Sequence, residues 1–252
     1  MPIVAADLKL FGAANHAEDD SSTQGGAIDL TCKLELGVLA ANDVIEMVSS
    51  DAGDTTPTVR LTARTAAGVI YQDTKTLNGT TAVDFTGTAE RILKVDVMSG
   101  TPNGTITIRR DAGGTTLCTL EPGITKVKTL GYNVKSSTSA AKSVYEKGFY
   151  KNTHGTISLT TASITLTTEA AEPADTLIAV ETSVNGTGTS TNRVTAPSGV
   201  GTFRQLNVAE PLPGDQNLDA GEAIAFWIQH DLAQSEPPFK DDVAVKLDGS
   251  TT

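Results

Sequence analysis

The chain has few of the residues that build most binding and catalytic sites. Only 4% of its 252 residues are aromatic, with a single tryptophan, Trp227, and it contains three histidines and two cysteines. So few rings leave little material for the stacking platforms on which proteins hold sugars. The core must therefore be built from Val, Ile, Leu and Ala, helped by the methyl groups of threonine.

Long apolar runs and runs of cations are also missing. No stretch approaches the length of a membrane-spanning helix, and the N-terminal MPIVAADLKLFGAA lacks the basic region of a signal peptide. The net charge is −11, and no run of Lys and Arg suits a phosphate backbone. We therefore expect no membrane partner, no nucleic-acid partner, and assembly in a cytoplasm.

The two cysteines, Cys32 and Cys118, stand far apart and lack the spacing of metal ligands. An isolated cysteine in a cytoplasmic protein behaves as a small hydrophobic residue. We expect both side chains to be buried thiols and not a disulfide.

Short alternating segments rich in Thr, Val and Ile dominate the chain. In TVRLTAR (residues 58–64), Val59, Leu61 and Ala63 share one face and the polar residues share the other. Turn signals recur roughly every ten residues, and Asn78-Gly79 is the preferred chemistry of a tight hairpin turn. The sequence predicts an all-β fold of two β-sandwich domains.

A change of phase interrupts the alternation in KNTHGTISLTTASITLTT (residues 151–168). Ile157 and Leu159 are apolar at odd positions, whereas Ala162 and Ile164 are apolar at even positions. A slip of one residue turns side chains to the opposite face of a strand. We expect a β-bulge, a bend or the end of a strand between these pairs.

Changes in composition divide the chain. Residues 1–26 end in the polar HAEDDSSTQGG and are predicted to form an extended N-terminal arm. Residues 27–131 form the first predicted β-sandwich. Residues 132–147, rich in Ser, Ala and Lys, form the predicted linker, and residues 148–252 form the second β-sandwich.

The predicted arm is apolar at its start but is not followed by a tight hairpin. Such a segment can gain free energy by adding a strand to the open sheet edge of another subunit. The candidates for intersubunit contact are Ile3, Val4, Leu8, Leu10 and Phe11.

Catalysis requires a titratable group held beside a partner, and the sequence places no such pair. His16 lies in the acidic arm, His154 precedes Gly155 in a predicted turn, and His230 ends a strand. Each is predicted to be a solvated residue, and no Gly-x-Ser-x-Gly elbow accompanies them. We expect no catalytic residues, no cofactor and no enzymatic activity.

One segment, DQNLDAGE, partly resembles a calcium-binding loop. Asp215, Asn217 and Asp219 match its first, third and fifth ligand positions. The sixth position, where the loop requires glycine, is Ala220, and Glu222 comes too early to close the site. We expect a polar turn before a strand, and no bound metal.

Several stretches resemble auxiliary structural proteins of tailed-bacteriophage virions that are built from immunoglobulin-like domains. They are AEDDSSTQGGAID, SSDAGDTTPTVRLTARTAAGVIYQDTKTLNGTTAV, FYKNTHGTISLTTASITLTT, NRVTAPSGV and LDAGEAIAFWIQHDL. The resemblance implies two immunoglobulin-like sandwiches, location in a virion, assembly in the cytoplasm of a bacterial host, and no cofactor. It offers no active-site residues.

Two roles in a virion remain open. The first is a capsid decoration (cement) protein that binds the major capsid protein or its neighbours, stabilises the outside of the head and forms a homo-oligomer, a trimer. The alternative is a tail protein, either a tail-tube or a tail-tip subunit. Tail-tube proteins generally carry a helix against their sheet, and the sequence predicts no convincing helix outside the linker, which favours decoration.

Overall fold

A computed structural model shows an all-β protein in which no α-helix occurs among the described residues. The structure describes residues 2–16, 18–130, 137–168, 175–235 and 243–251. The one helical element in these ranges is a 3₁₀ turn at Ala5–Asp7, and none of their helices is long and apolar enough to cross a bilayer.

The chain divides into two compact units. Unit 1 combines Met1–Asp29 with Leu130–Thr252, and unit 2 is Leu30–Thr129. Unit 2 is therefore inserted into the sequence of unit 1. Strand β2 (Gln24–Lys33) starts in unit 1 and ends in unit 2.

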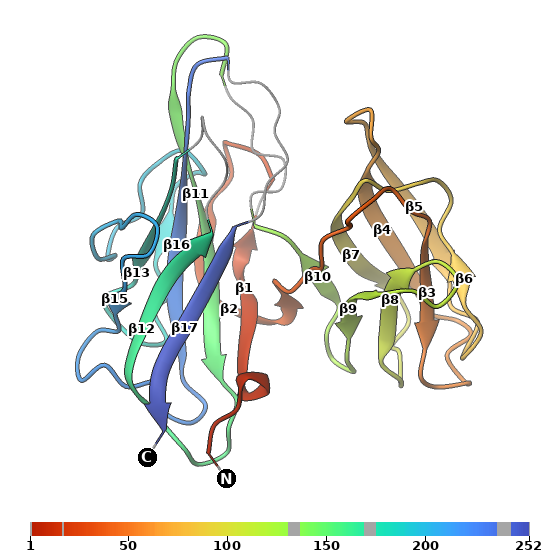
Figure 1. The fold of residues 1–252 in the computed structure, drawn as a ribbon, viewed down its shortest axis with the longest axis horizontal. Helices are drawn as coiled ribbons and strands as arrows, with labels where there is room; N and C mark the ends of the chain where they lie inside the picture. Colours follow the sequence, from red (N-terminus) through yellow and green to blue (C-terminus); the bar gives the residue numbers. More distant parts are fainter. Residues whose placement is uncertain (1, 17, 131–136, 169–174, 236–242, 252) are drawn as a thin grey trace. The chain divides into compact units, whose positions relative to one another are not determined.

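Unit 2 contains two sheets, seen in Figure 1 as the strands labelled β3 to β10. The first follows the end of β2 with β10 (Lys126–Lys128), β7 (Arg91–Ser99), β4 (Thr58–Arg64) and β5 (Ile70–Thr76). The second has the order β6 (Val83–Asp84), β3 (Ile45–Ser49), β8 (Ile106–Arg110) and β9 (Thr116–Leu120). The β2–β10 pair is parallel, and the other pairs are antiparallel.

The core of unit 2 lies between these sheets. Val59, Leu61 and Ala63 of β4 are fully buried, as the alternation in the sequence predicts, and they share one cluster with Ile106 and Ile108 of β8. Burial of a branched aliphatic side chain contributes roughly 1.5–3 kcal/mol. Unit 2 is thus a β-sandwich with an aliphatic core.

Unit 1 contains the remaining strands of the ten-stranded sheet to which β2 belongs, and a separate three-stranded sheet. The larger has the order β13 (Asp175–Val180), β16 (Ala223–Leu232), β11 (Lys142–Asn152), β1 (Leu8–His16) and the start of β2, which also pairs with β14 (Thr189–Ser190). The smaller has the order β15 (Glu210–Pro211), β12 (Leu159–Thr168) and β17 (Ala244–Thr251). In Figure 1, β12 and β17 pass in front of β11 and β16.

Residues from both sheets form the core of unit 1. Ile224, Phe226 and Ile228 of β16 pack in one cluster with Ile164 and Leu166 of β12. The intervening Trp227 points to the opposite face of β16, because successive side chains of a strand alternate, and it is fully buried as well. The strand β16 is therefore covered on both faces.

The prediction of an extended N-terminal arm is wrong for residues 8–16. They form β1, which pairs antiparallel with β11 from Leu8↔Asn152 to Gly12↔Gly148. An apolar alternating segment can add to the edge of any sheet, and here its own chain supplies that edge.

Four of the five candidates for intersubunit contact are used within the chain. Ile3, Leu8 and Leu10 pack against the core of unit 1, and Phe11 is buried opposite Phe149. Val4 is 56% exposed. Contact with another subunit stays a prediction for Val4, and the structure gives the other four side chains an internal role.

The predicted linker, residues 132–147, is wrong at its C-terminal end. Residues 142–147 are the first half of β11, and residues 131–136 lie outside the described residues. The predicted second domain, 148–252, therefore lacks part of its central strand as well as β1. The polar composition suggests an exposed linker, but two charged residues of β11, Glu146 and Lys147, are buried and form ion pairs.

The change of phase in residues 151–168 is a β-bulge. Strand β12 shifts register against β17 between Thr160 and Ser163, and Thr161 has a φ of 48°. The extra residue lets Leu159, Ala162 and Ile164 all face the core. This segment is structural, and its threonines form the outer surface of a sandwich.

The Asn78-Gly79 pair makes a tight turn but not the predicted hairpin between paired strands. Asn78 forms a bridge with Thr81, yet β5 before the turn and β6 after it belong to different sheets. Gly79 has a φ of 58°, and a Cβ there would lie 2.5 Å from the carbonyl oxygen of Ala52. The turn carries the chain from one sheet to the other.

Candidate functional site

Two buried ion pairs lie in unit 1, one on each face of β11. The side chain of Lys147 is completely buried, and its Nζ lies 2.6 Å from Oε1 of Glu181. Trp227 donates a hydrogen bond from Nε1 to the same carboxylate oxygen at 3.0 Å. The Lys147 ammonium also lies 4.7 Å from the centre of the Phe149 ring, within the range of a cation–π contact.

Lys147 holds two separate backbone segments together, β2 at Gly26 and the loop that contains Gly186 and Gly188. Its ammonium donates to the carbonyl oxygens of Gly26 at 2.9 Å, Gly188 at 3.1 Å and Gly186 at 3.2 Å. Burial lowers the pKa of Lys147, and the nearby Glu181 carboxylate opposes that shift. With every donor of the ammonium used, this lysine fixes the loop after β13 onto the sheet.

A second buried ion pair occupies the other face of β11. Nη2 of Arg193 lies 2.6 Å from Oε1 of Glu146, and both side chains are almost fully buried. Nε2 of His16 lies 3.9 Å from the same carboxylate oxygen. The backbone of Arg193 also accepts a hydrogen bond from the amide of Tyr145, which docks this part of the loop along β11.

The structure brings two of the three histidines close to this pair. His230 is buried beside Thr176, whose Oγ1 lies 3.3 Å from Nδ1 of the ring. Burial is the largest cause that lowers the pKa of His230, while the Glu146 carboxylate opposes the shift. The prediction that His16 and His230 are solvated is wrong, because both lie on strands whose neighbours cover them.

His154 lies in the turn between β11 and β12, as predicted. Its Nδ1 accepts hydrogen bonds from the amides of Thr156 and Ile157. The ring therefore shapes the turn. Among the hydrogen bonds found in the described residues, neither His154 nor His230 has a serine or cysteine partner.

The calcium-like segment forms a polar turn between β15 and β16. The Asp215 carboxylate accepts bonds from both the backbone amide and the side-chain amide of Asn217, and the amide of Asp219 donates to Glu222. These bonds stabilise a local turn instead of pointing oxygens at a common centre. Absence of a metal here stays a prediction.

Three carboxylates of unit 2 do come together. One ligand atom each from Glu46, Asp84 and Asp111 lies within 4.8 Å of the others, the one such group found in the described residues. The Glu46 carboxylate is paired with Arg109 and accepts a hydrogen bond from the amide of Gly113. Arg109 and the Gly113 amide already compensate the charge of the buried Glu46 carboxylate. Glu46 is therefore a structural ion-pair partner, and Asp84 and Asp111 are exposed acids beside it.

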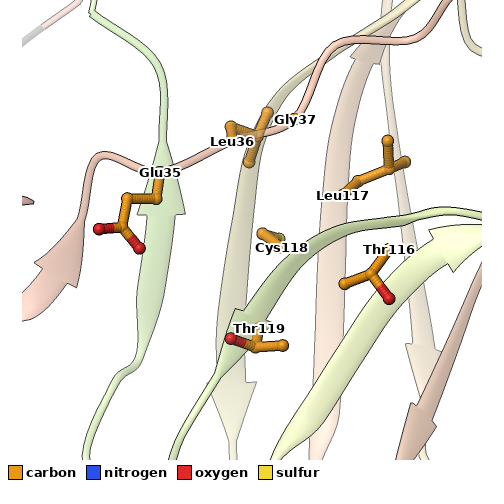
Figure 2. A pocket seen from close by; sticks show the side chains of 7 residues that line it. All are labelled: Glu35, Leu36, Gly37, Thr116, Leu117, Cys118 and Thr119. Atoms are coloured by element: carbon orange, nitrogen blue, oxygen red, sulfur yellow. The ribbon is translucent and has the colours of Figure 1, made fainter. Parts of the chain in front are cut away.

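An open pocket of about 370 Å³ lies in unit 2, and Figure 2 shows the side chains that line it. Residues from the segment after β2 and from β9 line it: Glu35, Leu36, Gly37, Thr116, Leu117, Cys118 and Thr119. The Cys118 thiol is buried, and burial raises its pKa to about 12. Such a thiol is not a nucleophile at neutral pH. Cys32 is buried as well and the two cysteines form no disulfide, so the prediction of two buried thiols is confirmed.

A surface that the sequence did not reveal lies on the outer face of the first sheet of unit 2. Its side chains alternate with the buried ones, so they point away from the core. We call the following five residues the basic face: Arg60, Arg64, Arg91, Lys94 and Lys126. Each is only partly exposed.

The basic face is already partly neutralised. Arg60 and Lys94 reach Asp96 at 3.0 and 3.3 Å, and Arg64 reaches Glu90 at 3.0 Å. The face nonetheless contains a direct cross-strand pair of like charges, because Arg64 is opposite Arg91. Like charges that are directly opposite destabilise a sheet unless other groups compensate.

The two units differ strongly in charge. Unit 2 has 10 Lys and Arg against 11 Asp and Glu, whereas unit 1 has 9 against 19. Almost all of the net charge of −11 therefore belongs to unit 1. The net charge of the whole chain therefore gives no sign of the basic face, which lies on the nearly neutral unit 2.

Comparison with protein-family models, with curated proteins and with solved structures finds no match to this chain.

Proposed function

We propose that this protein is a non-enzymatic structural component of a tailed-bacteriophage virion, a capsid decoration (cement) protein that stabilises the outside of the head. The observation that carries the proposal is that the buried ionisable groups hold the fold together. Lys147 with Glu181 and Arg193 with Glu146 tie loops to both faces of one strand. Buried pairs of this kind fix a unique, rigid arrangement when all their hydrogen bonds are made.

The groups that catalysis would need are placed unfavourably for it. His230 is buried with a lowered pKa, and Cys118 is held as a neutral thiol by its burial. An acid–base or nucleophilic group has to reach a substrate in the correct protonation state. The described geometry therefore supports a structural role more than an enzymatic one.

The fold also suits this role. Unit 2 spans 100 residues in two packed sheets, which is the size and layering of an immunoglobulin-like domain. We include the immunoglobulin-like assignment of both units in the proposal. Aliphatic sandwiches with few reactive groups make stiff modules that can bridge neighbouring capsid subunits.

The charge of the chain agrees with an outward position. An acidic surface repels the packaged DNA and other polyanions, and it keeps a particle soluble. We propose that the protein binds the major capsid protein as a homo-oligomer, a trimer at local threefold positions of the shell. Several weak contacts made by one oligomer bind together and raise the overall affinity by roughly a hundredfold or more.

Imaging of particles that lack this protein tests the proposal. Deletion of the gene should give particles with complete tails and heads that are bare and break more readily on heating. Re-expression of the wild-type protein should restore both the extra density on the head and its stability. Intact heads without tails would contradict decoration and would favour the alternative, a tail-tube or tail-tip protein. Particles unchanged in head and tail would contradict both.

A further inference from the structure

Strand β17 is an edge of the smaller sheet in unit 1. That sheet has the order β15, β12 and β17, and Figure 1 shows β17 beside β12. Among the described residues, no backbone hydrogen bond reaches β17 from its other side. An edge strand with unpaired N–H and C=O groups is a template for pairing with another strand.

The backbone groups of β17 that point away from β12 can be assigned residue by residue. Hydroxyl groups of β12 donate to the carbonyl oxygens of Ala244 and Ser250, so the even-numbered residues of β17 direct their backbone groups toward β12. This direction alternates along a strand. The outer edge therefore presents the N–H and C=O groups of Val245, Leu247 and Gly249.

The other edge strands that the structure describes are protected. The amide of Gly37 donates to the carbonyl oxygen of Leu117 along β9, and Arg204 forms a bridge with Ile178 along β13. Strand β5 directs the Asp73 carboxylate to the core side, and an inward-pointing charge at an edge discourages pairing. Strands β6 and β15 have only two residues each. The long edge of β17 is therefore an exception.

The side chains of β17 are self-complementary about Leu247. Lys246 and Asp248 flank this residue, and their side chains are 61% and 47% exposed. If two β17 strands pair antiparallel with Leu247 at the centre, Lys246 of each copy is opposite Asp248 of the other, which stabilises a sheet. A register centred on Lys246 or on Asp248 places like charges opposite each other. Registers centred on Val245 or Gly249 leave both charges without a partner of opposite sign.

We propose that β17 of one copy pairs antiparallel with β17 of a second copy, about a twofold axis at Leu247. The two smaller sheets then join edge to edge, with hydrogen bonds between the two Leu247 residues and between Val245 and Gly249. The carbonyl of Val245 already accepts a hydrogen bond from the hydroxyl of Tyr150, and a carbonyl oxygen can accept a second one. Leu247 is only partly buried against the core of unit 1, so its copy across the axis also covers apolar surface.

This twofold contact goes beyond the proposed trimer. It uses the same surface on both copies and is therefore isologous, so it would join one trimer to the next. A second copy suits the edge better than an unrelated strand does, because the order of Lys246, Leu247 and Asp248 complements itself in a single register. The contact does not depend on the proposed role in a virion, since purified protein is enough to test it.

Leu247→Cys tests the position of the axis, because residue 247 is the edge position that meets its own copy. Hydrogen-bonded antiparallel partners have Cα atoms about 5.5 Å apart, which a disulfide can span. Ser250→Cys is the matched control, since that position lies about 20 Å from its own copy across the axis. The native Cys32 and Cys118 are buried and should contribute little. Under mild oxidation, Leu247→Cys should give about tenfold more covalent dimer than Ser250→Cys. An equal or smaller yield would overturn the proposal.

Charge reversals test the register with residues whose side chains point to solvent. Lys246→Glu and Asp248→Lys each place like charges opposite each other, so each protein alone should associate about tenfold more weakly than the wild type in sedimentation equilibrium. An equimolar mixture of the two should recover the association, because each variant then meets opposite charges on the other. The double variant Lys246→Glu/Asp248→Lys keeps the net charge and should associate like the wild type.

Recovery in the mixture can come only from contact between copies, because residues 246 and 248 of each single variant still repel each other within the chain. Single reversals that leave the association unchanged, or a mixture that does not recover it, would overturn the proposed pairing. So would a wild-type protein that stays monomeric at ~100 μM and low salt. A trimer held by other contacts would not respond to these charges, so failure here is distinct from failure of the proposed function.

Discussion

Glu146 and Lys147 are consecutive residues of β11, and each makes a buried ion pair on the opposite face of the same sheet. The Glu146 carboxylate meets Arg193 at 2.6 Å, and the Lys147 ammonium meets Glu181 at 2.6 Å. Both partners belong to the segment that follows β13. Glu146 and Lys147 therefore attach the long segment after β13 to the sheet at two points, one on each face of β11.

Removal of the Lys147 ammonium should strongly destabilise the protein. Lys147→Met leaves the buried Glu181 carboxylate without its ammonium partner, although the indole of Trp227 still donates a hydrogen bond to it. Loss of one partner of a buried pair typically costs about 3–5 kcal/mol of the free energy of unfolding. Urea denaturation followed by the fluorescence of Trp227 measures this loss.

The double variant Lys147→Met/Glu181→Gln should be less destabilised than the sum of the two single variants, because no charge remains buried without a partner. The exposed Lys246–Asp248 pair provides the control. Lys246→Met should change the free energy of unfolding by less than about 1 kcal/mol. Similar losses for Lys147→Met and Lys246→Met would contradict the assigned role.

Acidic pH should lower the free energy of unfolding, because His230 is protonated more readily in the unfolded chain than in the folded protein. Burial lowers the pKa of His230 below its usual value of 6.5, so the unfolded chain takes up this proton at a higher pH than the folded protein does. Stability is therefore complete above pH 6.5 and falls as the pH decreases toward the folded pKa. The slope contributed by one proton reaches about 1.4 kcal/mol per pH unit.

His230→Gln should flatten the dependence of the free energy of unfolding on pH between about pH 7 and pH 5. Thr176→Val is the matched control, because it removes the hydrogen bond at Nδ1 but keeps the titrating ring. It should lower stability at every pH and keep the slope. An unchanged slope in His230→Gln would show that another group carries the effect.

The bulge of β12 contains a residue in an unfavourable conformation. Thr161 has a φ of 48°, and a β-branched residue rarely adopts positive φ because its Cβ crowds the backbone. Thr161→Gly should therefore raise the free energy of unfolding by about 1 kcal/mol. Thr160→Gly, one position earlier in the same strand, should lower it by a similar amount. Thermal unfolding of the two variants gives the comparison, and a lower melting temperature for Thr161→Gly would refute it.

The inserted arrangement predicts how fragments behave. Residues 27–131 contain all of unit 2 and should unfold cooperatively on their own. Residues 148–252 lack β1 and the first half of β11, including one member of each buried ion pair, Glu146 and Lys147, and should not fold. Residues 1–29 joined directly to 130–252 should fold as unit 1. A cooperative transition in 148–252 alone would contradict this division.

Simple alternation was enough to predict the strands with one polar and one buried face. Val59, Leu61 and Ala63 are buried as predicted, and so are Ile224, Phe226 and Ile228. The bulge near Thr161 was among the predicted possibilities, because a phase change has few structural explanations. In these segments, the local pattern and the tertiary environment agree.

Prediction failed where a partner distant in the sequence decides the environment. Glu146 and Lys147 suggest a solvated linker until Arg193 and Glu181 are placed beside them. His16 suggests an exposed arm until β1 joins β11. The cations of the basic face come from three strands, and the sheet register alone brings Arg64 next to Arg91. None of these neighbours is visible in a local window of sequence.

The strands of unit 1 cannot all pair in the order in which the ribosome makes them. Strand β1 emerges first, but its partner β11 is made only after all of unit 2. At 5–20 residues per second, synthesis of unit 2 takes roughly 5–20 s, which is ample time for a domain of this size to fold. Folded unit 2 pairs Cys32 with Lys126 and so holds its entry and exit together. A loop of about one hundred residues is thereby closed in advance, and the entropy cost of joining β1 to β11 falls accordingly.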